Sequence, residues 1–168
     1  YRLTFQDGKD TLTITVLEDT KVVDGVRTRV VEERETKGGQ IAEGDLVGEN
    51  ADSVRDEINA LRVTALGRKA DLTKRVEVEQ MVEKILSQFG QLDILVNSAG
   101  WDKLEPFLES SEETWERILA VNFKSVLYTA KAVLPHMISR GSGKSVNISS
   151  DAGRVGSSWE AVYSGAKG

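Results

Sequence analysis

The chain has 168 residues, a net charge of −5 at pH 7 and a pI of about 5.1. This acidic balance gives no electrostatic support to a nucleic-acid partner or to binding at an anionic membrane surface. The sequence has no cysteine, which excludes disulfides and thiolate metal sites, and its single histidine, His136, belongs to no cluster with metal-ligand spacing. No run is apolar and long enough to span a bilayer and no signal peptide opens the sequence, so we expect a cytoplasmic protein.

Residues 1–44 have the pattern of β-structure. Apolar residues at 12, 14 and 16 alternate with threonines, a period of two that is typical of a half-buried strand. A further β-branched strand is expected over residues 27–35, with turns at Asp24-Gly25 and Gly38-Gly39. Because the segment has no helical periodicity, we predict a small antiparallel β-meander.

From residue 45 onward, strands alternate with helices. We expect strands at residues 63–69, 92–96 and 146–148, and helices at residues 50–61, 78–89, 111–122 and 123–139. The run at 92–96 is nearly all apolar, which is typical of a strand buried on both faces of a parallel sheet. The predicted fold class is therefore α/β, a partial Rossmann-like parallel sheet with flanking helices that follows the meander. We place the domain boundary between residues 44 and 45.

Polar residues gather where three of the expected strands end. Asp71, the turn Asn97-Ser98-Ala99-Gly100 and the pair Ser149-Ser150 each follow a strand directly. In open parallel sheets, ligands bind outside the carboxyl ends of the strands. The small residues of the 97–100 turn would let a ligand approach the backbone closely, although a tight turn alone also explains them.

Tyr163 and Lys167 lie four residues apart, where we expect a helix to begin, so they should share one helical face. A free tyrosine has a pKa of about 10, and an ammonium group one turn away favours the phenolate and brings that pKa toward neutrality. A tyrosine with such a lysine neighbour is suited to donate and accept a proton in catalysis. Ser150 could hold a carbonyl or alcohol oxygen beside Tyr163. Taken alone, the pair could also be a solvated lysine beside a packed tyrosine.

Residues 45–168 resemble the short-chain dehydrogenase/reductase family. The family's Asn-Asn-Ala-Gly motif appears as Asn97-Ser98-Ala99-Gly100, and its active-site asparagine, serine and Tyr-x-x-x-Lys match Asn122, Ser150 and Tyr163 with Lys167. The resemblance implies reversible hydride transfer between a nicotinamide cofactor, NAD or NADP, and a small-molecule alcohol or ketone. It also implies a homo-oligomer.

The resemblance assigns a role to each matched residue. Tyr163 would be the acid/base, and Ser150 would hold the substrate oxygen. Lys167 would lower the tyrosine pKa and bind the nicotinamide ribose, while Asn122 would hold a water of the proton relay. Asp71 would contact the adenine, and Asp45 would bind the ribose 2′-hydroxyl and favour NAD over NADP. The implied cofactor-binding residues are Asp45, Asp71, Asn97, Ala99, Gly100, Tyr163 and Lys167.

Two features depart from the family pattern. The family's glycine-rich turn, Thr-Gly-x-x-x-Gly-x-Gly, whose helix N-terminus binds the pyrophosphate, does not occur in this sequence. The family pattern also continues with further strands and helices after the position that Lys167 matches. We therefore expect this chain to bind NAD(H) weakly and to turn over no substrate by itself. We also expect one apolar edge of the parallel sheet to be left unpaired.

Two functional hypotheses follow. The first is an oxidoreductase, and Trp101-Asp102 with residues 149–156 is similar to family members that act on hydroxyacyl thioesters, such as 3-oxoacyl-carrier-protein reductases and 2-hydroxycyclohexanecarboxyl-CoA dehydrogenases. The second is a non-catalytic fusion or β-module chain that uses the α/β part only as a scaffold. Binding of NADH discriminates between them.

Overall fold

A computed structural model describes residues 2–7, 10–15, 26–27, 31–34, 40–45, 52–53, 55–56, 59–60 and 64–168. The strands are β1 Arg2–Asp7, β2 Asp10–Thr15, β3 Val26–Arg27, β4 Val31–Arg34, β5 Gln40–Asp45, β6 Thr64–Lys69, β7 Ile94–Asn97, β8 Gly100–Trp101 and β9 Lys144–Asn147. The helices are α2 Arg75–Phe89, α3 Glu112–Leu119, α4 Ser125–Arg140, α5 Asp151–Val155 and α6 Ala161–Lys167, with a 3-10 turn η1 Phe107–Glu109 and a π-helical turn η2 Ala120–Lys124. None of the helices in these ranges has the length and apolar character needed to cross a membrane.

The N-terminal strands form an antiparallel sheet in the order β1-β2-β4. Leu3 of β1 lies opposite Ile14 of β2, and Ile14 lies opposite Glu32 of β4. The antiparallel β-structure predicted before the α/β part is therefore confirmed. Within the strand expected over residues 27–35, Val31–Arg34 form β4 of this sheet, whereas Arg27 belongs to β3, which pairs antiparallel with β8. The turns predicted at Asp24-Gly25 and Gly38-Gly39 lie outside the described residues.

Strand β5 crosses the predicted boundary between residues 44 and 45. It pairs in parallel with β6, from Gln40 opposite Thr64 to Asp45 opposite Lys69. The described residues between the two strands, at 52–53, 55–56 and 59–60, are helical, in agreement with the helix expected there. Because parallel neighbours need such a crossover, residues 40–44 belong to the parallel part of the fold and not to the meander.

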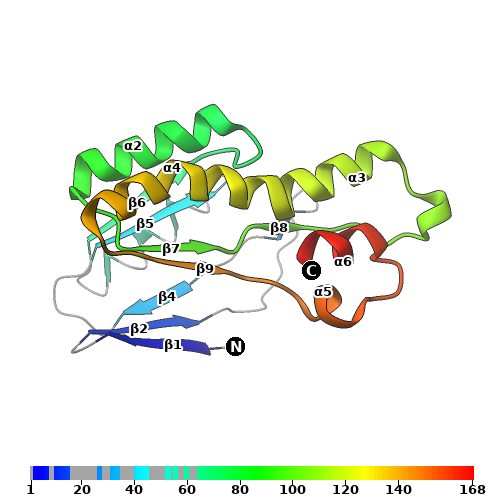
Figure 1. The fold of residues 1–168 in the computed structure, drawn as a ribbon, viewed down its shortest axis with the longest axis horizontal. Helices are drawn as coiled ribbons and strands as arrows, with labels where there is room; N and C mark the ends of the chain where they lie inside the picture. The colour runs from blue at the N-terminus through cyan, green and yellow to red at the C-terminus, as the bar shows by residue number, and fades with distance from the viewer. Residues whose placement is uncertain are drawn as a thin grey trace.

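A hydrophobic core cluster lies between α2, α4 and the strand β7 (Figure 1). Val82 of α2 packs with Val133 and Met137 of α4, and half-buried leucines from the segment around β7 pack against this cluster. The spacing of four residues puts Val133 and Met137 on one face of α4. Gly90 and Gly141 end the two helices with φ of 76° and 66°, the left-handed conformation that favours glycine.

Strands β7 and β9 pair in parallel, with Leu95 opposite Ser145 and Val96 opposite Val146. The sequence predicted a strand buried on both faces, but β7 is half-buried throughout and β9 is exposed at three of its positions, Lys144, Ser145 and Asn147. Among the described strands, β7 has a ladder only with β9, and β5 only with β6. No described strand joins the two parallel pairs.

The layers place the carboxyl ends of the strands beside the last two helices. In Figure 1, α2 and α4 lie on one side of the β7–β9 pair and the antiparallel sheet lies on the other. Helices α5 and α6 follow β9 and lie close to β8, at the end of the β7–β9 pair to which both strands run.

Candidate active site

Helix α6 holds the tyrosine–lysine pair. Tyr163 and Lys167 are one turn apart, and the Lys167 Nζ lies 5.9 Å from the centroid of the Tyr163 ring. Both side chains are half-buried. The helix predicted for this segment is therefore present, and it places the two side chains on one face.

Lys167 is held by the segment that follows β9. Its Nζ donates a hydrogen bond to the carbonyl oxygen of Ile148 at 3.1 Å, and its own carbonyl oxygen accepts one from the Ser149 hydroxyl. Burial lowers the pKa of Lys167 below its ordinary value, because removal from water disfavours the charged form. An ammonium group carries three N–H donors, so Lys167 can keep the bond to Ile148 and still donate to a ligand.

Asn122 joins this group from the π-helical turn η2. It is 4% exposed, and its Nδ2 donates to the carbonyl oxygens of Trp101 at 2.6 Å and Ile118 at 2.9 Å. Its Oδ1 accepts from the backbone nitrogen of Trp101 at 3.2 Å. A Cβ atom placed on Gly100 would lie 3.3 Å from the Asn122 Oδ1 and 3.8 Å from the Lys167 Nζ. Asn122, Lys167 and the glycine backbone therefore converge.

Ser150 begins the short helix α5, which was not predicted from the sequence. Its Oγ accepts from the backbone nitrogen of Ala152 at 3.2 Å, so Ser150 is the N-cap. Helix α5 packs against α6 through Gly153, where an added Cβ would lie 2.4 Å from the carbonyl oxygen of Lys167. Only a glycine fits this approach.

The remaining predicted cofactor residues also follow strands. Asn97 ends β7, where its Oδ1 accepts from the Thr129 Oγ1 at 2.7 Å and its Nδ2 donates to the Asn147 Oδ1 at 2.8 Å. Ala99 is half-buried and precedes β8, while Asp45 ends β5. The structure thus brings together Gly100, Asn122, Tyr163 and Lys167, whereas Asp45 and Asp71 lie at the ends of the β5–β6 pair.

Asp71 forms a turn ahead of α2. Its Oδ1 accepts from the Thr73 backbone nitrogen at 3.0 Å and from the Thr73 hydroxyl at 2.6 Å, and its Oδ2 lies 3.3 Å from the Lys74 Nζ. Burial by itself raises the pKa of Asp71, but the hydrogen bonds from Thr73 and Lys74 outweigh it and hold the pKa below the ordinary value of 3.8. The carboxylate therefore stabilises the turn as well as being a candidate for the adenine.

Replacing Asp71 with asparagine should make the free energy of unfolding less sensitive to acid. A carboxyl group with a lowered folded pKa stabilises the protein above 3.8, and this stabilisation is lost as the pH falls through the folded pKa. Between about pH 5 and pH 2, denaturant unfolding should show the wild type losing roughly 1 kcal/mol more than Asp71→Asn. Asp151→Asn makes the same chemical change at a carboxylate whose side chain is 89% exposed, and is the matched control. Parallel curves for wild type and Asp71→Asn would contradict the assignment.

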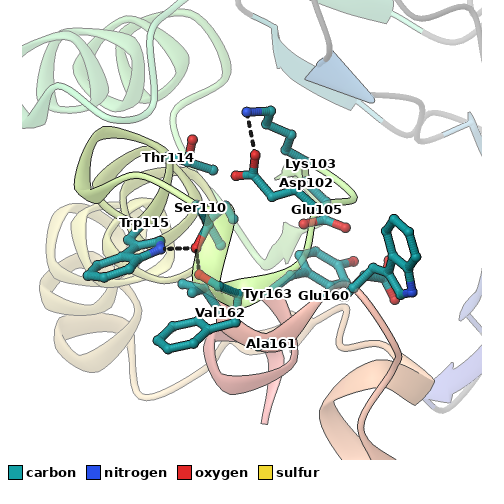
Figure 2. Close-up of a pocket in the computed structure, with 13 residues that line it drawn as sticks. Asp102, Lys103, Glu105, Ser110, Thr114, Trp115, Glu160, Ala161, Val162 and Tyr163 are labelled. Atoms are coloured by element: carbon teal, nitrogen blue, oxygen red, sulfur yellow. Dashed lines mark hydrogen bonds and ion pairs between the residues drawn. The ribbon is translucent and has the colours of Figure 1, made fainter.

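An open pocket lies against Tyr163 (Figure 2). Its walls come from the loop between β8 and η1, from α3 and from the segment that enters α6. The polar lining residues are Asp102, Lys103, Glu105, Ser110, Thr114, Glu160 and Tyr163. Figure 2 shows the dashed ion pair between Lys103 and Glu105 on the opposite side of the pocket from α6.

Sequence reasoning missed three contributors to this region. The Trp101 backbone forms hydrogen bonds with the Asn122 amide, and Glu105 lines the pocket. The absence of a side chain at Gly153 allows the Lys167 carbonyl oxygen to pack against it. For Trp101 the signal was its place directly after the 97–100 turn. Gly153 gave no local signal, because its neighbour lies in another helix.

Comparison with known proteins identifies a family that the chain matches. The model described as short chain dehydrogenase matches residues 22–168, a span that begins ahead of residue 45. The chain is 31% identical over 131 residues to the 3-oxoacyl-acyl-carrier-protein reductase of Thermotoga maritima, covering 78% of this chain and 53% of that protein. The chain spans about half the length of the curated relatives that it matches.

Two solved structures share the fold. They are the crystal structure of an NAD+-bound xylitol dehydrogenase and that of a metagenomic short-chain oxidoreductase in complex with NADP. Each has a TM-score of 0.72 and 28% identity over 76% of this chain. The matches cover 50% of the first of these chains and 58% of the second.

Proposed function

Because this chain belongs to the short-chain dehydrogenase family, we propose that its site transfers hydride between a nicotinamide cofactor and a small-molecule alcohol or ketone. The observation that carries the proposal is the convergence of Tyr163, Lys167 and Asn122 beside the bare backbone of Gly100. Tyr163 supplies a proton donor, Lys167 supplies a cation, and Gly100 lets a ligand approach the backbone closely beside them.

Each residue has a role in this chemistry. The bound nicotinamide supplies or accepts the hydride. In reduction, Tyr163 donates its phenolic proton to the ketone oxygen, and in oxidation the phenolate takes the proton back from the alcohol. The positive charge of Lys167 favours the phenolate, and the Ser150 hydroxyl holds the substrate oxygen.

Several residues fit a nicotinamide cofactor. Lys167 has donors for a ribose hydroxyl, and the absence of a side chain at Gly100 leaves room for a ligand near Asn122 and Lys167. Asp71 would contact the adenine, and Asp45 at the end of β5 would bind the ribose 2′-hydroxyl and favour NAD. The NAD+-bound and NADP-bound relatives support a nicotinamide cofactor.

The reductase similarity also supports the expectation that a hydroxyacyl thioester is a candidate substrate. A homo-oligomer remains a proposal that rests on the family.

One observation favours the non-catalytic alternative. Strand β3 pairs with β8, so Arg27 lies opposite Gly100 and Val26 lies opposite Trp101. Backbone from the N-terminal segment therefore occupies the edge of the turn that a cofactor would approach. In this alternative, the α/β part serves as a scaffold for the N-terminal strands.

Titration of the chain with NADH, followed by nicotinamide fluorescence, tests these proposals. We expect weak binding, with a dissociation constant above about 1 mM, because the 168 residues contain no Thr-Gly-x-x-x-Gly-x-Gly turn to donate backbone hydrogen bonds to the pyrophosphate. Saturable binding in the micromolar range would overturn that expectation.

The control is a chimera in which residues 40–168 replace the matching segment of a family member, which supplies the glycine-rich turn. The chimera should bind NADH and prefer NAD to NADP, because Asp45 would repel a 2′-phosphate. A chimera that folds but binds no cofactor would favour the scaffold alternative.

A further inference from the structure

The buried face of α4 carries two kinds of side chain. Its buried residues are Ser125, Thr129, Val133 and Met137, which are four residues apart and therefore share one face. Val133 and Met137 belong to the hydrophobic core cluster. Ser125 and Thr129, which lie closer to Asn122 along the chain, have hydroxyl groups and are only 3% and 4% exposed. Because buried hydroxyls are hydrogen-bonded, the partners of these two side chains indicate what each one does.

Thr129 links α4 to the end of β7. Its hydroxyl oxygen lies 2.7 Å from the Asn97 Oδ1, and 3.0 Å and 3.1 Å from the carbonyl oxygens of Val126 and Ser125 in its own helix. A hydroxyl has one proton to donate, and Asn97 offers the shortest of the three contacts. The Ser125 hydroxyl instead donates to the carbonyl oxygen of Val121 at 2.6 Å. Thr129 therefore bonds to a strand, whereas the hydroxyl one turn earlier bonds to the helix backbone.

Asn97 in turn holds the end of β9 by two hydrogen bonds. Its Nδ2 donates to the Asn147 Oδ1 at 2.8 Å, and its backbone carbonyl oxygen accepts from the backbone nitrogen of Ile148 at 2.9 Å. An asparagine amide has a donor end and an acceptor end, and donation from Thr129 directs the acceptor end toward α4. The donor end then faces Asn147. Loss of the Thr129 hydroxyl would leave the Asn97 Oδ1 without this donor and free the amide to rotate.

Ile148 connects the end of β9 to the reactive pair. Its backbone nitrogen bonds to Asn97, and its carbonyl oxygen accepts from the Lys167 Nζ at 3.1 Å. The same Nζ lies 5.9 Å from the centroid of the Tyr163 ring. Because the effect of a charge on a phenol depends on the distance between them, the position of the Ile148 carbonyl helps to set that effect. The hydrogen bonds thus form one continuous path from α4 through β7 and β9 to α6.

We propose that Thr129 is a positioning residue for Lys167, and that it acts through Asn97. The role rests on the proposed function, because that function takes Lys167 as the cation beside the reacting phenol. Thr129 belongs to none of the motifs that carry the resemblance to the family, so its role comes from its contacts. It holds the amide that holds the end of β9, and the end of β9 holds the ammonium group.

Two NMR measurements on the 168-residue chain test this role. Amide hydrogen exchange reports how firmly the Ile148 N–H is bonded to Asn97, and a pH titration of the Lys167 Cε signal, assigned with Lys167→Arg, reports the surroundings of the ammonium group. Thr129→Val keeps the shape and removes the hydroxyl, and should make the Ile148 amide exchange about tenfold faster. The pKa of Lys167 should rise toward its ordinary value of 10.5, because burial lowers it and release from Ile148 lets water reach the ammonium group.

Matched variants separate positioning from general packing. Thr129→Ser keeps the hydroxyl, and should restore both the Ile148 exchange rate and the Lys167 titration of the wild type. Ser125→Ala removes a buried hydroxyl whose bond stays within α4. It should leave both measurements unchanged, even where it lowers the free energy of unfolding. If Thr129 only packed the helix, Thr129→Val and Ser125→Ala would give the same pattern.

Asn147→Ala tests the same path from its exposed end. Asn147 is exposed, so the substitution leaves the core intact, and it should change Ile148 exchange and the pKa of Lys167 in the same directions as Thr129→Val. It decides the matter if Thr129→Val fails to fold.

Unchanged Ile148 exchange and an unchanged Lys167 titration in the folded variants would overturn the proposal. So would equal changes in Ser125→Ala. Neither measurement involves hydride transfer, so the two proposals can fail separately. If both changes occur but the chimera that carries residues 40–168 transfers no hydride, Thr129 positions Lys167 and the proposed reaction is wrong.

Discussion

Replacing Tyr163 with phenylalanine should abolish hydride transfer in the chimera that carries residues 40–168, and should leave cofactor binding nearly intact. The substitution removes the proton that passes to and from the substrate oxygen, and general acid–base catalysis contributes about 10²–10⁴-fold in rate. The ribose contact of Lys167 is untouched, so the dissociation constant for NADH should change little. Steady-state kinetics with a ketone substrate, together with NADH titration, separates the two quantities.

Two further variants complete this test. Tyr128→Phe makes the same chemical change on α4, outside the group formed by Gly100, Asn122, Tyr163 and Lys167, and should keep full activity. Lys167→Ala should weaken both turnover and cofactor binding, because it removes the charge beside the phenol and the ribose donor together. If Tyr163→Phe kept most of the activity, the acid/base assignment would be wrong.

Replacing Gly153 with alanine should reduce turnover in the same chimera about 10²-fold or more, although Gly153 contacts no substrate. Its added Cβ would lie 2.4 Å from the Lys167 carbonyl oxygen and 2.7 Å from the backbone nitrogen of Gly168. Because both are backbone atoms, α5 and α6 must move apart, and a shift of about 1 Å in a catalytic group can cost about 100-fold in rate. The loss should appear in kcat, since the helix that carries Lys167 also carries Tyr163.

Gly165 provides the matched control for Gly153. It lies in α6 between the two reactive residues, and a Cβ added there would meet no atom within 4 Å. Gly165→Ala should therefore keep activity and raise the free energy of unfolding by up to about 1 kcal/mol, because alanine favours a helix more than glycine does. Equal activity of the Gly153 and Gly165 variants would show that the contact between α5 and α6 does not position Lys167.

Features with a local cause were predictable from the sequence. Ser111 caps α3 by accepting from the Thr114 backbone nitrogen, at the residue where the helix over 111–122 was expected to begin. The helices expected over residues 78–89 and 123–139 end at or within one residue of the C-terminal ends of α2 and α4, where Gly90 and Gly141 follow, because a C-cap glycine acts within one turn. The one-turn spacing of Tyr163 and Lys167 is local in the same sense.

Features that depend on distant partners were not predictable. β3 lies far from β8 in sequence, and β-branched residues at 26–34 give no sign of which strand they will pair with. The helix at 151–155 was not predicted, because it is stabilised by the Ser150 cap and by packing on α6 and not by a helical pattern of its own residues. The exposure of β9 follows from which strands surround it, a property that its own residues do not carry.

The π-helical turn at Ala120–Lys124 acts as a one-residue insertion that corrects the phase of a long helix. Buried positions run from Thr114 in α3 to Met137 in α4. Along an uninterrupted α-helix, which turns about 100° per residue, Met137 would lie about 140° around the helix axis from Thr114. The π turn absorbs one residue, so the angle between the two side chains around the axis is about 40°. Restoring regular α-helical geometry through Ala120–Lys124 with all five residues kept would therefore separate two faces that now coincide. The helix would keep its length, but Asn122 could not bind Trp101 while Val133 and Met137 remained in the core.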